Sequence, residues 1–149
     1  MSSVVLTSAV REESRSIGRG RFARLGLVTV IAATVANVLV YYLGAAIIGY
    51  DPTFVVLENV GGAIFFTIPA AIIAVLLYAV LLRTAANPEH TFTIISAVVL
   101  VLSVIPDITY IPTVAGSSNA QTAVLILMHV VAAAVIVGML ARYTRPKVR

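Results

Sequence analysis

The chain contains no cysteine among its 149 residues. Disulfides, cysteine-ligated metals and thiol redox mechanisms are therefore excluded. The same absence excludes the quinone and vitamin K reductases that use paired cysteines in small four-helix membrane bundles.

Charge is also scarce, because only 11% of the residues are charged and 60% are hydrophobic, with a mean hydropathy of +1.07. A soluble domain carries about 25% charged residues. A chain this poor in charge has too little polar surface to cover a water-soluble globule. The composition therefore predicts an integral membrane protein. The net charge is +4, but the basic residues flank the apolar runs. In a membrane protein this placement indicates the orientation of the spans. No nucleic-acid binding is therefore expected.

Uncharged runs long enough for the roughly 20 helical residues of a membrane span cover residues 25–48, 62–82 and 121–141. A further segment is ambiguous, because residues 91–105 would rise only about 22 Å in a core of roughly 30 Å. Extension to Ile111 gives a full span but includes Pro106 and Asp107. We favour the extension, because neighbouring groups in a membrane bundle satisfy the carbonyl that a proline frees. The fold predicted is an all-α, four-helix transmembrane bundle with spans at about 25–48, 62–82, 91–111 and 121–141.

Local patterns predict how the spans begin. Ser118 and Gln121 match a capping box, with Ser118 as N-cap. Asp51-Pro52 suits the start of a short interfacial helix that runs through Glu58. Gly61-Gly62 is expected to break the chain before the second span.

The basic residues predict the orientation. They lie in the basic segment 1–24, at Arg83 between the second and third spans, and in the basic tail 142–149. With four spans, all of these fall on one side of the membrane, and the opposite loops carry no Lys or Arg. The positive-inside rule then places both termini in the cytoplasm, and we expect a multi-pass protein of the plasma (inner) membrane, as the family resemblance given below implies.

Polar side chains gather in the outer half of the predicted bundle. At 1.5 Å per residue, His129 lies roughly 12 Å below the outer end of the fourth span. Ionisable residues at such depth usually face the interior and pair with one another, so they are functional-site candidates. The candidate polar cluster in the outer half consists of His129, Asp107, Asn37, Tyr41, Thr67 and Ser103.

Two interpretations of His129 remain open. In the first, Asp107 stabilises its imidazolium in a proton relay or ligand site, opened outward by a kink at Pro106. In the second, which we favour, the two residues form a satisfied hydrogen bond between helices and His129 is neutral. Pro69 is a second candidate kink.

No cofactor and no metal site are predicted, since the ligands for zinc or di-iron are lacking. His90 is separated from His129 by much of the membrane thickness, which excludes a bis-histidine haem within one chain. Ligation of one tetrapyrrole by His129 alone remains an alternative.

The runs ATVANVLVYYLGAA, TFTIISAVVLVLSVIPDI and TAVLILMHVVAAAVIVGMLAR resemble an uncharacterised family of small four-span bacterial membrane proteins, a domain of unknown function. The resemblance covers roughly residues 22–142. It is carried by Asn37, by Pro106-Asp107 and by Met128-His129. It implies a four-helix bundle in a bacterial inner membrane and supplies no activity.

The function expected is therefore that of a non-enzymatic accessory or scaffold subunit. Its partners would be the lipid bilayer and other membrane subunits or a second copy of the chain, bound through helix–helix contacts. One alternative is a membrane protein that handles a small ligand, a pigment or protons at His129 and Asp107. Another is an enzyme in which this pair acts as acid and base on a lipid-like substrate.

Overall fold

The computed structural model describes residues 18–143, which form helices, turns and no strand. In chain order the helices are α2 (Arg19–Ile48), α3 (Val60–Thr84), α4 (Pro88–Thr109), the short 3₁₀ helix η1 (Ile111–Thr113) and α5 (Asn119–Tyr143).

Four helices in this part of the chain are long and apolar enough to cross a membrane. This confirms the all-α prediction with four candidate spans. The second and fourth predicted spans lie within α3 and α5, and the first lies within α2. Helix α2 begins at Arg19, so it takes up the end of the predicted basic segment 1–24. Residues 1–17 and 144–149, which hold the rest of that segment and most of the predicted basic tail, lie outside the described residues.

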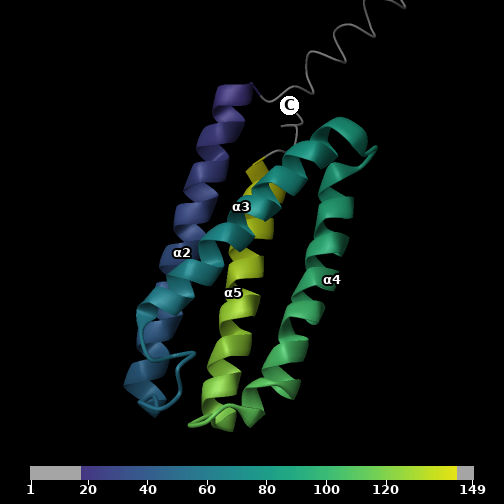
Figure 1. Ribbon diagram of the computed structural model, residues 1–149. Helices are drawn as coiled ribbons and strands as arrows, with labels where there is room; N and C mark the ends of the chain where they lie inside the picture. Colours follow the sequence, from purple (N-terminus) through teal and green to yellow (C-terminus); the bar gives the residue numbers. More distant parts are fainter. Residues whose placement is uncertain (1–17, 144–149) are drawn as a thin grey trace, which may run out of the picture.

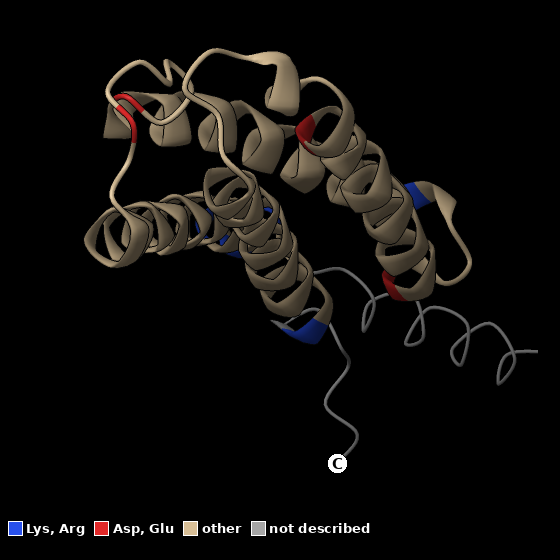
Figure 2. Ribbon diagram, turned by 90° about the horizontal axis from the view of Figure 1, so that it is seen from below, with Lys and Arg blue, Asp and Glu red and all other residues tan. Residues whose placement is uncertain are grey.

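Helix α5 is the central element of the bundle. It packs against α2, α3 and α4, whereas α2 and α4 do not touch. Figure 1 shows α5 between α2 and α4, with α3 running obliquely across α2 and α5. One end of the bundle, here called the basic end, holds Arg19, Arg83 and Arg142. The opposite end, here called the loop end, holds the connections 49–59 and 110–118, and Asp51, Glu58 and Asp107 lie toward it (Figure 2).

Helix α2 presents one narrow face to the bundle, and this face is rich in small and polar residues. A Cβ atom built on Gly26 would lie 2.7 Å from the side chain of Val75, so glycine permits close approach of α2 and α3. Small residues at helix contacts are typical of membrane bundles, where van der Waals packing drives association. The buried positions follow the helical period of 3.6 residues: Gly26, Thr29, Ala33, Asn37, Tyr41 and Gly44.

Two apolar clusters hold the helices together, one toward each end. Toward the basic end, the fully buried rings of Tyr78 and Phe92 have centroids 4.8 Å apart, and Leu140 packs in the same cluster. At the loop end, Phe54 and Leu57 from the α2–α3 connection insert against Tyr41 of α2 and Met128 of α5, among others. The α2–α3 connection is thus part of the core.

The prediction of an interfacial helix from Asp51 to Glu58 is wrong, because the segment folds as consecutive turns. The Asp51 carboxylate accepts hydrogen bonds from the Thr53 backbone N–H at 2.8 Å and from its hydroxyl at 2.6 Å. Such local bonds compete with helix formation. The break expected at Gly61-Gly62 is also wrong, since α3 begins at Val60 and Asn59 caps it by accepting from the Gly61 N–H at 2.9 Å.

The extended third span is confirmed, because α4 continues through Pro106 to Thr109 and η1 lengthens the span to Thr113. The carbonyl of Pro106 accepts from the N–H of Tyr110 at 2.9 Å, so helical bonding resumes directly after the proline. Pro69 lies inside α3 in the same way. The kinks at these two prolines stay predictions.

The capping box before α5 is present with one change. Ser118 Oγ accepts from the Gln121 backbone N–H at 3.3 Å, as predicted. The Gln121 side chain does not return to the Ser118 backbone, because its Oε1 accepts from the Ser118 hydroxyl at 2.9 Å.

Candidate functional site

His129 and Asp107 lie side by side between α5 and α4. The distance from His129 Nδ1 to Asp107 Oδ2 is 3.1 Å. The side chain of Asp107 is 8% exposed, whereas that of His129 is 38% exposed. The structure therefore brings the two residues into contact, with the carboxylate inside the bundle and part of the ring at its surface.

A second acceptor decides which nitrogen of His129 carries a proton. Nδ1 lies 2.9 Å from the carbonyl oxygen of Leu125, one turn earlier in α5. A carbonyl oxygen only accepts, so this contact requires a proton on Nδ1. That N–H is aimed at Leu125, and Asp107 Oδ2 has no well-aligned hydrogen-bond donor. The pair is thus a close electrostatic contact in which Leu125 fixes the tautomer and leaves Nε2 as the nitrogen that can gain a proton.

Asn37 and Thr67 tie α2 to α3. Asn37 Nδ2 donates to Thr67 Oγ1 at 2.8 Å, and the Thr67 hydroxyl donates to the carbonyl of Ala63 at 2.6 Å. Both side chains are buried, and Asn37 Oδ1 has no partner. This bond is of the kind that polar residues make between membrane helices.

Tyr41 ties α2 to the α2–α3 connection. Its hydroxyl donates to the carbonyl of Leu57 at 3.1 Å, and Tyr50 in turn donates to the carbonyl of Tyr41 at 2.7 Å. Burial, with a smaller contribution from the neighbouring Tyr41, raises the pKa of Tyr50 above its usual value of 10.0. The Tyr50 hydroxyl is therefore a neutral donor at physiological pH.

Ser103 stands apart from the other candidates. Its hydroxyl donates to the carbonyl of Leu100 in its own helix at 2.8 Å. Among the described residues, no hydrogen bond joins Ser103, the Asn37–Thr67 pair and the His129–Asp107 pair. The predicted polar cluster therefore divides into separate ties between neighbouring elements, and Ser103 belongs to none of them.

The comparison with known families now decides the classification, because a family model matches residues 17–146, a range that includes all four long helices. The chain belongs to the family of unknown function (DUF6069). Membership in this family, together with four long apolar helices, identifies a multi-pass membrane protein. Searches of curated proteins and of solved structures found no match to the chain.

Metal ligands do not gather within the described part of the chain, where no group of three or more His, Cys, Asp or Glu side chains is placed to hold an ion. His90 lies near the start of α4 at the basic end, and His129 lies in α5 toward the loop end. Ligation of a tetrapyrrole by His129 alone stays a prediction.

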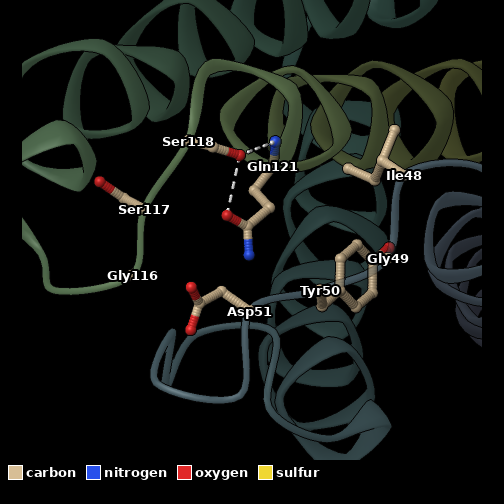
Figure 3. Close-up of a pocket in the computed structure, with 8 residues that line it drawn as sticks. All are labelled: Ile48, Gly49, Tyr50, Asp51, Gly116, Ser117, Ser118 and Gln121. Carbon is tan, nitrogen blue, oxygen red and sulfur yellow. Dashed lines mark hydrogen bonds between the residues drawn. The ribbon is translucent and has the colours of Figure 1, made fainter.

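Sequence reasoning missed a cavity of about 500 Å³ at the loop end. Figure 3 shows the side chain of Gln121, in the first turn of α5, pointing toward Asp51 of the α2–α3 connection. The only sequence signal was the capping box, which marks Gln121 as a helix-start residue. The position of Gln121 in the wall of this cavity depends on two connections that are distant in sequence and adjacent in space.

Proposed function

We propose that this protein is a non-catalytic accessory or scaffold subunit that binds another membrane protein, or a second copy of itself, along the seam between α4 and α5. The observation that carries the proposal is the 38% exposure of the His129 side chain at a membrane-embedded position of that seam. Ionisable side chains within membrane spans almost always face a protein interior or water. A helix laid over the seam would enclose the exposed part of the ring.

Helix α4 supports this assignment because it is the least enclosed of the four. Its buried residues are Phe92 and Asp107. In the most apolar stretch of this helix, only 11% of the residues are buried, against 28% in the corresponding stretches of α2 and α5. Exposed valine and leucine on a membrane helix face lipid at no cost, so they carry no weight here. The polar edge beside them is the part of the surface that favours a protein partner.

The orientation belongs to the same proposal. Arg19, Arg21, Arg24, Arg83 and Arg142 gather at the basic end, and the described loop end has no Lys or Arg. The positive-inside rule therefore supports cytoplasmic termini.

The test is native extraction in mild detergent followed by crosslinking and identification of bound subunits. Replacement of His129 by Leu should lower recovery of the bound subunit, because the exposed ring is part of the contact. His90→Leu is the matched control, since His90 is an exposed histidine of α4 at the opposite end. Equal loss in both variants, or no loss in His129→Leu, would contradict an interface on this seam.

The contact of 3.1 Å between His129 Nδ1 and Asp107 Oδ2 favours a second candidate, a proton-handling pair. Nε2 would take a proton from the exposed side while the buried carboxylate stabilises the imidazolium. Proteoliposomes with an internal pH dye test this directly. Proton flux that disappears in Asp107→Asn supports the candidate, and flux equal to that of empty liposomes removes it.

A further inference from the structure

The cavity at the loop end is built by two connections that the chain brings together. Gly116 lies against the turn at residues 51–54 with φ of +72°, and a Cβ atom there would lie 2.8 Å from Phe54 N and 3.0 Å from Asp51 Oδ1. The walls combine this turn with the start of α5 (Figure 3). It has a volume of about 500 Å³ and is open over most of its extent.

Gln121 offers this cavity an unused hydrogen-bonding group. The residue is 2% exposed, and its Nε2 has no partner. Figure 3 shows that Nε2 points away from Ser118 into the space that Asp51 borders. A flipped amide would leave the oxygen unpartnered instead and turn it toward a carboxylate, so the orientation with N–H toward the cavity is favoured. A buried donor without a partner is costly and is normally satisfied by water or a ligand.

Asp51 supplies negative charge at the opposite wall. Hydrogen bonds from the Thr53 side chain and backbone hold the pKa of this carboxyl below its usual value, so it is ionised at neutral pH. Both bonds go to Oδ1. Oδ2 therefore remains available for a cation. The other wall includes the first turn of α5, where the helix dipole favours an anionic group.

An apolar cavity of about 230 Å³ shares one lining residue with the polar one. It lies between α2 and α5, and its lining includes Leu43, Gly44, Val124 and Leu127. Ile48 lines both cavities, and Val124 lies one turn along α5 from Gln121. A polar pocket at the ends of α2 and α5 and an apolar pocket between the same two helices therefore lie on either side of Ile48.

We propose that the two cavities together bind one aminophospholipid of the leaflet at the loop end. Its ammonium group contacts Asp51 Oδ2, an oxygen of its phosphate accepts from Gln121 Nε2 beside the start of α5, and one acyl chain lies in the groove between α2 and α5. The separation of an anionic wall from a donor wall matches a zwitterionic head. A lipid that is anionic overall would place an uncompensated negative charge near Asp51.

The experiment is native mass spectrometry of the full chain, purified in detergent and offered equal amounts of phosphatidylethanolamine and phosphatidylglycerol. We expect one phosphatidylethanolamine to be retained in preference to phosphatidylglycerol. Glycerophosphoethanolamine, which has the same head and no acyl chains, should not displace it. Equal retention of the two lipids would overturn the proposal and indicate unspecific annular lipid.

Two variants test the head contacts. Asp51→Asn keeps an acceptor for Thr53, and Gln121→Glu keeps an acceptor for the Ser118 hydroxyl. Asp51→Asn removes the contact to the ammonium group, so it should reduce the preference for phosphatidylethanolamine over phosphatidylglycerol by about tenfold or more. Gln121→Glu removes the contact to the phosphate, which both lipids carry, so it should reduce the retention of phosphatidylethanolamine itself by about tenfold or more. Glu58→Gln is the matched control, because it removes an acidic charge from the same connection outside the cavity. Undiminished preference in Asp51→Asn refutes the site, and circular dichroism establishes that each variant is folded.

His129→Leu separates this inference from the proposed subunit contact. The ring of His129 lines neither cavity. Lipid preference should therefore be unchanged in this variant, whether or not its subunit contact is lost. Loss of preference in His129→Leu would mean that the lipid lies on the α4–α5 seam, which contradicts the site at Asp51 and Gln121.

Discussion

At the scale of single residues, the polar groups in the spans act mainly as ties between particular elements. Asn37 joins α2 to α3, Tyr41 joins α2 to the α2–α3 connection, and His129 joins α5 to α4. A polar group left without a partner in a bilayer costs free energy, because no water replaces the lost bond. Each tie therefore selects one rotation of its helix over others that would bury equal apolar area.

The Asn37–Thr67 tie gives a prediction about stability. Thr67→Val removes the acceptor at 2.8 Å and leaves the buried Asn37 amide without a partner. We expect the free energy of unfolding in detergent to fall by about 1–2 kcal/mol. Thr34→Val is the control, because the Thr34 hydroxyl bonds only to Val30 of its own helix. The prediction is wrong if Thr67→Val and Thr34→Val lose equal stability. Thr67→Ser keeps a hydroxyl acceptor for Asn37, so it should retain most of the stability of the unmodified protein.

Residue depth was predictable from the sequence, but side-chain direction was not. Length along the spans placed His129 roughly 12 Å and Asp107 about 6 Å below the outer ends of their helices, and they do touch. The same reasoning placed Ser103 with them, yet its hydroxyl bonds within α4. Depth follows from the fixed rise per residue, whereas the direction of a side chain around the helix depends on which neighbours pack there.

At the scale of elements, the lengths of the spans could be predicted from the sequence because the bilayer sets them. The conformation of the connections could not be predicted. Apolar runs of about 20 residues specify helices because the backbone must satisfy its own hydrogen bonds in lipid. Asp51-Pro52 suits a helix start equally well, but the Thr53 bonds to Asp51 stabilise a turn instead. The roles of Tyr50 and Gln121 depend on the docking of two connections, which no local pattern encodes.

Docking of those connections gives a second prediction. Gly116→Ala would introduce a Cβ atom against Phe54 N and Asp51 Oδ1 at a residue with φ of +72°. Gly49→Ala has a similar positive φ of 61°, with nothing within 4 Å of the added atom. Backbone strain costs about 1–3 kcal/mol at either site. Any greater loss of stability in Gly116→Ala than in Gly49→Ala therefore measures the clash of the added Cβ atom with the turn. Thermal unfolding in detergent should show a larger loss for Gly116→Ala, and equal losses would mean that the connections do not pack closely.

At the scale of the whole molecule, charge is distributed between the two ends of the bundle. The basic end holds all the described arginines, and Asp51 and Glu58 lie at the loop end (Figure 2). This asymmetry sets the expected orientation through the positive-inside rule. The absence of native cysteine makes the orientation measurable with single substitutions.

The third prediction concerns this orientation. Ser117→Cys lies at the loop end and Ala86→Cys in the α3–α4 connection at the basic end. In intact cells, a membrane-impermeant maleimide should label position 117 directly and position 86 only after permeabilisation. The reverse pattern would show that the loop end faces the cytoplasm.

The central place of α5 has a consequence for biosynthesis. Ribosomes make α5 after the other described helices, yet it supplies the packing surface that α2, α3 and α4 share. Until α5 enters the bilayer, Asp107 has no His129 beside it. A nascent chain arrested before residue 119 therefore holds an uncompensated acidic group in a membrane span. The last helix inserted completes the bundle and encloses this carboxyl beside His129.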